Sequence, residues 1–226
     1  MLLCNHSSIK IAFLNNSYIR HKISISHYAP EFYDMPSLCD TMTMKLILFN
    51  KPYLVMSQFS KHESRPTLSE FIPIPDIYPA GRLDADSEGL MLLTDDGQLQ
   101  HKISHPDYKE AKTYLVQIEG IPDPDQLNRL QNPLNLGDFI TQPCQVQRIQ
   151  EPDWLWERHP PIRTRAAIPT SWIAITLKEG KNRQVRRMTA AVGLPTLRLI
   201  RSAIGPYSLQ SNPLLPGEWM ELEVGN

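Results

Sequence analysis

A chain of 226 residues that is 41% hydrophobic is long enough to bury a substantial core, and the sequence predicts one folded domain. The net charge of −1 does not by itself indicate a nucleic-acid partner, so that question depends on where the charges lie. Three cysteines without metal-type spacing exclude a disulfide or zinc framework, and no apolar run approaches the ~18 residues that cross a bilayer. We therefore expect a soluble, cytoplasmic protein with no membrane partner.

The first 43 residues are rich in serine and asparagine and show no sustained hydrophobic period. Their three basic and three acidic side chains balance each other. This composition predicts a disordered extension over 1–43 and a folded domain over 44–226. Because Met42 and Met44 immediately precede the first convincing strand, an over-extended start site is an open alternative.

The elements of the folded domain follow one another in a mixed pattern. Strands are predicted at 45–49, 53–57, 90–94, 113–119, 145–149, 171–177, 197–202 and 218–222. Helical patterns fall near 67–71, 97–104, 125–130 and 183–192. Twenty prolines, many of them between elements, oppose a bundle of long helices. The pattern predicts an α+β domain with flanking helices and one large, mostly antiparallel sheet.

The helix predicted over 183–192 has ends that can be read from the sequence. Asn182 is placed as its N-cap and Gly193 as its C-terminal stop. At ~100° per residue, Arg183 and Arg187 lie opposite the apolar face, and Arg186 lies on the flank. The apolar face comprises Val185, Met188, Thr189 and Val192. We predict that Arg186 reaches into a cleft, whereas Arg183 and Arg187 are free to meet phosphates.

An acidic turn precedes the apolar strand at 90–94. Six acidic residues fall between Asp76 and Asp96, against a single basic residue, Arg82. About a hundred residues further on, 178–201 carries seven Lys/Arg and one acid. An acidic turn and a basic helix in a nearly neutral chain indicate a charge-paired site on a surface for a polyanion. Asp84 is the candidate nucleophile, and the alternative is an ordinary turn or helix-cap aspartate.

Three separated motifs carry a family resemblance. They are Gly-Arg-Leu-Asp with Ser-x-Gly-Leu at 81–90, Lys-Thr-Tyr at 112–114 and Glu-Gly-Lys-Asn-Arg-Gln-Val-Arg-Arg-Met at 179–188. In this order they resemble the RsuA-type pseudouridine synthases. Further matches to the large-subunit ribosomal branch of that family lie at 49–53, 154–156 and 168–172. The resemblance covers roughly 45–222, and residues 1–44 do not resemble the S4-type RNA-binding module that many members carry.

This resemblance implies an isomerase that converts a uridine of large-subunit ribosomal RNA to pseudouridine, with an active-site cleft and without cofactor or metal. Asp84 matches the attacking aspartate of the family. Tyr114 matches the tyrosine that stacks on the target uracil, although a strand tyrosine is ordinarily core or surface filling. Arg186 matches the basic residue that pairs with the catalytic carboxylate and keeps it ionised. We further expect a monomer.

Several side chains are candidates for RNA contacts. Arg82 matches a family residue that fills the stack of the flipped uridine or grips phosphates. The segment 151–170 interleaves tryptophans with arginines, which suits stacking on unpaired bases, although tryptophans that plug the domain's own core are an equal alternative. The full set is Arg82, Lys112, Lys181, Arg183, Arg187, Trp154, Trp156, Arg163 and Arg165.

Two competing interpretations remain at this stage. A non-catalytic ribosomal-RNA-binding or ribosome-assembly protein would need only the basic surface. A calcium loop is approached by Asp84, Asp86, Glu88 and Asp95 with Gly89 between them, but Glu at position five and Asp at position twelve oppose it.

A zinc site is also weighed at one histidine pair. His101 and His105 have i,i+4 spacing without the adjacent glutamate of a zinc protease, so a solvated helix face is expected.

Overall fold

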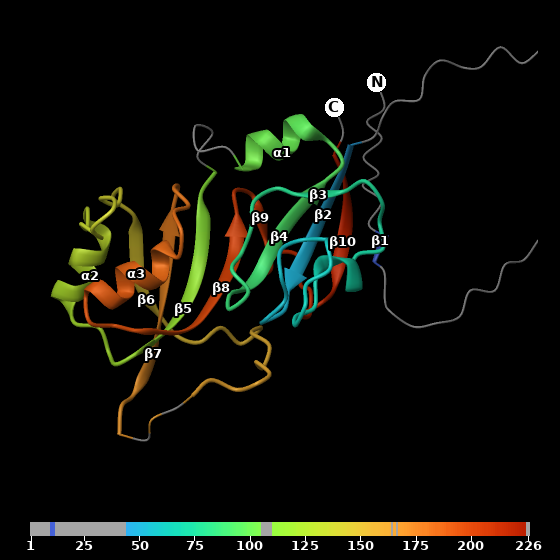
Figure 1. The fold of residues 1–226 in the computed structure, drawn as a ribbon. Helices are drawn as coiled ribbons and strands as arrows, with labels where there is room; N and C mark the ends of the chain where they lie inside the picture. Colours follow the sequence, from blue (N-terminus) through green and yellow to red (C-terminus); the bar gives the residue numbers. More distant parts are fainter. Residues whose placement is uncertain (1–9, 12–43, 105–109, 164, 166, 225–226) are drawn as a thin grey trace, which may run out of the picture.

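The computed structural model describes residues 10–11, 44–104, 110–163, 165 and 167–224. They build one ten-stranded sheet with strand order β1-β10-β2-β4-β8-β5-β7-β6, in which β3 also pairs with β4 and β9 with β8 (Figure 1). The strands are β1 (Lys10–Ile11), β2 (Met44–Lys51), β3 (Tyr78–Pro79), β4 (Glu88–Thr94), β5 (Lys112–Glu119), β6 (Gln145–Ile149), β7 (Thr170–Leu177), β8 (Thr196–Ile204), β9 (Tyr207–Ser208) and β10 (Trp219–Val224). The helices are α1 (Gly97–Ser104), α2 (Pro124–Gln131) and α3 (Gln184–Ala191), with a 3₁₀ turn at Leu68–Glu70.

The sheet consists of two antiparallel halves that meet at one parallel strand pair, called the parallel seam below. The halves are β1-β10-β2-β4 and β8-β5-β7-β6, and β4 meets β8 through Glu88 opposite Ile200 and Gly89 opposite Arg201. Gly89 has φ of 105°, and a Cβ at this position would clash with the backbone of Arg201. A glycine is therefore required where β4 pairs with β8. The acidic turn comes immediately before this seam.

The core lies on both faces of the sheet. Along β2 and β4, alternate residues enter one of two hydrophobic clusters, which explains why both strands read as continuous apolar runs. Val185 and Met188 of α3 and Leu130 of α2 join the first cluster, and Ile103 of α1 joins the second. Figure 1 shows α3 and α2 in front of the half that contains β5, β7 and β6.

The predicted α+β fold with a mostly antiparallel sheet is confirmed. Two predicted elements differ, and the two-residue strands β1, β3 and β9 were not predicted. The segment 53–57 is not a strand, because Pro52 lacks a donor, Leu54 has a positive φ of 66° and only Met56 makes a bridge, to Thr67. The helical pattern near 67–71 is only a 3₁₀ turn.

The start of α3 also differs from the prediction. Its N-cap is Arg183 instead of Asn182, in the left-handed region with φ of 49° and without a side-chain cap hydrogen bond. Gly193 follows the end of the helix with φ of 80°, as a C-terminal stop requires.

The proposed N-terminal extension is described only at Lys10–Ile11, which pairs with Met220 and Glu221 of β10. The rest of 1–43 lies outside the described residues, and its disorder stays a prediction.

Candidate active site

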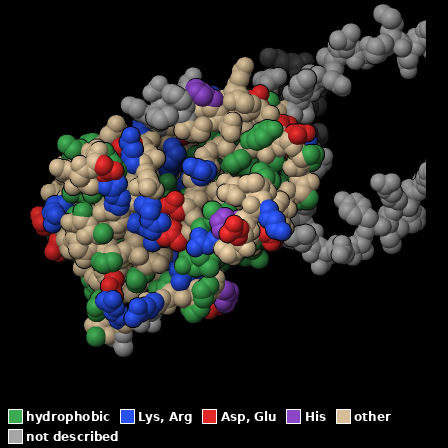
Figure 2. All heavy atoms as spheres, in the orientation of Figure 1, with side chains coloured by type: hydrophobic (Ala, Val, Ile, Leu, Met, Phe, Trp, Pro, Cys, Tyr) green, Lys and Arg blue, Asp and Glu red, His purple; other side chains and the backbone are tan. Residues whose placement is uncertain are grey.

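The three sequence motifs meet at one cleft of about 770 Å³. The acidic turn contributes Arg82 and Asp84, β5 contributes Lys112 and Tyr114, and the segment before α3 contributes its residues from 178 to 183. Lys and Arg side chains gather around a hollow in the middle of the face shown in Figure 2. The convergence of distant motifs on one basic cleft makes it the candidate active site.

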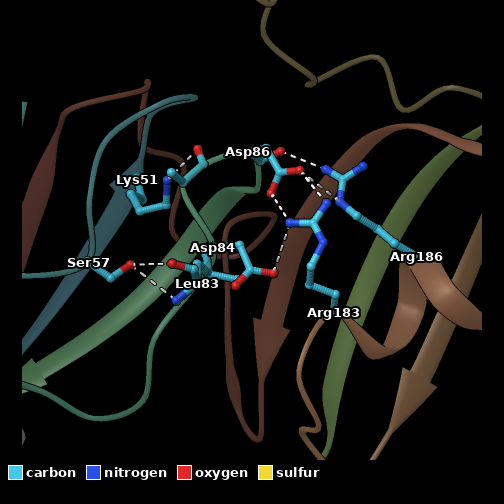
Figure 3. Close-up of polar contacts among 8 residues, drawn as sticks. Lys51, Ser57, Leu83, Asp84, Asp86, Arg183 and Arg186 are labelled. Atoms are coloured by element: carbon cyan, nitrogen blue, oxygen red, sulfur yellow. Dashed lines mark hydrogen bonds and ion pairs between the residues drawn. The ribbon is translucent and has the colours of Figure 1, made fainter. Parts of the chain in front are cut away.

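Buried polar contacts fix the turn that carries Asp84 (Figure 3). Ser57 Oγ donates to the carbonyl of Leu83 at 2.7 Å and accepts from the Leu83 amide at 3.1 Å. The carbonyl of Ala85 accepts from the amide of Leu54 at 2.7 Å and from Lys51 Nζ at 3.4 Å. Both neighbours of Asp84 in the chain are therefore anchored, while the side chain of Asp84 itself is 43% exposed.

Arg183, and not Arg186, is the cation next to Asp84. Arg183 Nη1 lies 3.8 Å from Asp84 Oδ2, at ion-pair distance but beyond hydrogen-bond distance. The predicted direct pair of Arg186 with Asp84 is not formed. Arg186 Nη2 donates to the backbone carbonyl of Asp86 at 2.7 Å, and its Nε lies 3.4 Å from Asp86 Oδ2. Arg186 does not line the cleft. Its side chain is partly buried, 15% exposed, but it does not reach into the cleft as its flank position had predicted.

Asp86 is the carboxylate on which both arginines converge (Figure 3). Arg183 donates to it through both terminal nitrogens, at 3.0 and 2.7 Å. Although burial opposes ionisation, the hydrogen bonds from Arg183 and the charge of Arg186 hold the pKa of Asp86 below its usual range. The same hydrogen bonds raise the pKa of Arg183, whereas burial lowers the pKa of Arg186.

Tyr114 and Arg201 form adjacent positions of the cleft from paired strands. Tyr114 is 8% exposed and pairs in register with Arg201 of β8, and both line the cleft. Arg201 is 3% exposed, and its Nε donates to the carbonyl of Leu90 at 2.8 Å. Lys112 also lines the cleft, and burial lowers its pKa. A buried tyrosine therefore lies among cations in the cleft, as a site for an anionic, planar substrate requires.

The other predicted RNA contacts are divided by the structure. Arg82 and Lys181 are exposed at the cleft, and Arg163 is exposed elsewhere. The sequence predicted that Arg187 is free to meet phosphates, and this is wrong. Arg187 pairs with Asp138, donates to the carbonyl of Leu136 at 2.6 Å and stacks over Phe139. Arg165 has an exposed side chain and lies 3.5 Å from the partly buried Glu119 in an ion pair.

The two tryptophans pack against the domain's own core. Trp154 and Trp156 are half-buried against the second and third hydrophobic clusters. The indole of Trp156 donates to Glu88 Oε1 at 2.9 Å, and Arg198 binds the same carboxylate through Nε and Nη2, each at 2.9 Å. These contacts give Trp156 the packing role that the sequence left as an alternative.

Glu88, the carboxylate of this network, is also position five of the calcium-loop pattern. Glu88 is 2% exposed and paired with Arg198, so its carboxylate cannot turn toward a cation held by Asp84 and Asp86. Among the described residues, no group of three or more His, Cys, Asp or Glu side chains could hold a metal ion. His105 lies outside the described residues, so the solvated helix face expected for this histidine pair stays a prediction. In the same part of the chain, no helix is long and apolar enough to cross a membrane.

Sequence reasoning missed two positions that shape the site. Lys51 is fully buried and donates to the carbonyls of Pro52 at 2.8 Å and Val55 at 2.9 Å as well as Ala85, and burial lowers its pKa to about 7. Asp86 was considered only as a calcium ligand. For Lys51, the available signal was a lysine at the end of a buried strand, immediately before Pro52. For Asp86, it was the pair of arginines at 183 and 186, three residues apart at the start of α3.

Comparisons with known proteins agree with this geometry. A family model described as RNA pseudouridylate synthase matches residues 45–191. The chain is 57% identical over 180 residues to a Vibrio vulnificus (strain CMCP6) protein called ribosomal large subunit pseudouridine synthase E, covering 80% of this chain and 76% of the relative. A protein of the same name from Xanthomonas campestris pv. campestris is 54% identical over 176 residues, covering 77% of this chain and 93% of the relative. A crystal structure of a pseudouridylate synthase aligns with a TM-score of 0.65 at 28% identity, covering 79% of this chain and 70% of that one.

Proposed function

The chain belongs to the RNA pseudouridylate synthase family, and we propose that its substrate is a uridine of large-subunit ribosomal RNA. Relatives that share more than half of their aligned residues with it carry that substrate in their names. The predicted resemblance to this family is confirmed. The observation that carries the proposal is the placement of Asp84 in one basic cleft with Tyr114 and Arg183.

In this reaction the bond from ribose C1′ to uracil N1 breaks, the base rotates, and C1′ joins C5 of the same base. The C5 proton is lost and N1 gains one, so atoms and charge balance without a redox partner. Asp84 is the nucleophile, because its carboxylate is exposed to the cleft and no described residue donates a hydrogen bond to it. Tyr114 packs against the uracil and holds it while it is detached.

Arg183 supplies positive charge beside Asp84, the role predicted for Arg186, and Arg186 instead holds the turn through the backbone carbonyl of Asp86. The rim cations Arg82, Lys112 and Lys181 contact phosphates of the RNA. Arg163, Arg165 and the half-buried Trp154 are candidates for contacts outside the cleft. The protein acts as a cytoplasmic monomer in this proposal.

The substrate proposal is tested by mapping pseudouridines in ribosomal RNA from cells with and without the gene. One large-subunit pseudouridine should disappear on deletion and return when the wild-type gene is restored. An unchanged map, together with retained RNA binding by the purified protein, would support the non-catalytic RNA-binding alternative instead.

The proposed chemistry requires no cofactor, because a carboxylate nucleophile and a cleft that excludes water suffice for it. We expect full activity of the purified protein in excess chelator, measured as tritium release from 5-tritiated uridine in the RNA. Activity that is lost in chelator and restored by calcium or zinc would contradict this expectation.

A further inference from the structure

The polar contacts between the acidic turn and α3 converge on one carboxylate that does not itself face the cleft. Asp86 receives two hydrogen bonds from Arg183, an ion pair from Arg186 and, at its backbone carbonyl, a third arginine hydrogen bond from Arg186 Nη2. In the described part of the chain, the 3.8 Å ion pair of Arg183 with Asp84 is the other polar contact between them. Asp86 is absent from the cleft lining, whereas Asp84 and Arg183 belong to it.

Arg183 adopts a backbone conformation that serves this contact. Its φ of 49° lies in the left-handed region, which a residue other than glycine rarely adopts. The residue is the N-cap of α3, yet its side chain caps no helix amide and instead reaches across to the turn (Figure 3). The energetic cost of that conformation is offset by a two-point hydrogen bond to a partly buried carboxylate.

The arrangement places the positive charge of Arg183 beside Asp84 without a hydrogen bond between the two side chains. A cation within ~4–6 Å favours the ionised carboxylate that a nucleophile needs. A hydrogen bond donated straight to that carboxylate would occupy a lone pair and weaken its attack. Two of the five N–H groups of Arg183 donate to Asp86, and this orients the guanidinium so that Nη1 lies 3.8 Å from Asp84, beyond hydrogen-bond distance.

We propose that Asp86 is a positioning residue for the nucleophile: it takes the hydrogen bonds of Arg183 and so holds this cation near Asp84 while leaving the Asp84 carboxylate free to react. This inference rests on the proposed function and assigns a further residue to it. The fold also contains a matched control. Arg187 of the same helix pairs with Asp138 outside the cleft, in a second arginine–aspartate contact that braces α3.

The test compares single-turnover rates of pseudouridine formation at saturating enzyme for wild type, D86N, R183M, the double variant D86N/R183M, and D138N. Without the Asp86 anion, Arg183 is free to donate directly to Asp84, so D86N should lower the rate ~10- to 100-fold with little change in RNA affinity. D138N, which loses an equivalent brace, should keep the wild-type rate. Melting temperatures of all variants separate these rates from loss of fold.

The double variant decides the mechanism. If Arg183 blocks Asp84 once Asp86 is gone, removing Arg183 as well should recover part of the D86N loss. Arg186 of α3 and Lys51 of β2 also interact electrostatically with Asp84, and both are common to the two variants.

A crystal structure of D86N tests the inference independently of any activity measurement. The Arg183–Asp84 contact should contract from 3.8 Å to hydrogen-bond distance. A double variant as slow as D86N or slower, a wild-type rate for D86N, or an Arg183 that turns to solvent would each overturn the inference. If D86N does not fold, Asp86→Glu, which keeps the anion, should retain a higher rate than Asp86→Ser. Absence of pseudouridine formation by wild type would instead refute the proposed function.

Discussion

Asp84 and Glu88 lie four residues apart in one acidic segment, and the structure gives their carboxylates opposite surroundings. Glu88 is 2% exposed and accepts hydrogen bonds from Arg198 and Trp156, so its bonding capacity is used inside the protein. Asp84 is 43% exposed, faces the cleft and has a cation only at 3.8 Å. The comparison shows that two acids in one motif are separated into a structural and a chemical role by burial and by hydrogen bonding.

The largest expected effect is on the chemical side of the comparison. Asp84→Asn removes the nucleophile and should reduce single-turnover isomerisation below detection. Since the side chain is exposed and makes no hydrogen bond within the described residues, the free energy of unfolding should change by less than about 0.5 kcal/mol. RNA affinity should be nearly intact, because the basic surface is unchanged. Near-wild-type turnover would remove Asp84 from the role.

On the structural side, Glu88→Gln should act in the opposite way. It leaves the Arg198 guanidinium buried without a counter-charge, which costs about 3–5 kcal/mol of unfolding free energy. Chemical denaturation measures this loss. The double variant Glu88→Gln/Arg198→Met should lose less than the sum of the two single changes, because the pair is removed together. Additive losses would mean that the two side chains do not act as one unit.

Lys51 sharpens the comparison because it is fully buried yet anchors the exposed turn. Its pKa of about 7, lowered by burial, means that between pH 7 and 10.5 the unfolded chain binds a proton that the folded chain does not. Stability from this group is therefore fully present above pH 10.5 and is lost as pH falls toward 7.

The measurement compares unfolding free energies of wild type and Lys51→Met at two pH values. Wild type should gain about 2 kcal/mol relative to Lys51→Met between pH 7.5 and 9. A difference that does not change over this interval would indicate that Lys51 stays charged in the folded protein.

The smallest effects are expected at the exposed cations, where charge serves binding alone. Lys181→Met should lower the slope of log affinity against log salt by about 0.7 to 0.9, as for one lost phosphate contact. Arg187→Met should lower it less, because Asp138 already neutralises this charge. Titrations of RNA at several salt concentrations measure both slopes, and equal reductions would show that the Asp138 pair opens when RNA binds.

Local patterns predicted much of the fold. The bounds of α1 and β6 coincide with the predicted 97–104 and 145–149. The strand expected at 53–57 failed because the backbone of this segment is used elsewhere: the amide of Leu54 and the carbonyl of Val55 bond to Ala85 and Lys51. No local pattern reports a partner thirty residues away.

The sequence predicted which residues lie at the site more accurately than which of their side chains contact one another. The prediction for Arg183 assumed helical geometry and placed the side chain away from the core. The left-handed backbone at this N-cap removes it from the helical wheel and directs it to Asp86. The role of Trp156 likewise depends on Glu88, which is 68 residues away in the chain.

The parallel seam has a consequence for the order in which activity arises during synthesis. Glu88 and Gly89 meet Ile200 and Arg201, more than a hundred residues later, and β2 acquires its second neighbour only when β10 is present. Closing such a long loop carries an entropic cost before the seam contributes any contacts. The half that carries Asp84 is therefore without its guanidinium partners until the segment before α3 and β8 have left the ribosome. We expect catalytic competence to begin only when the two halves join.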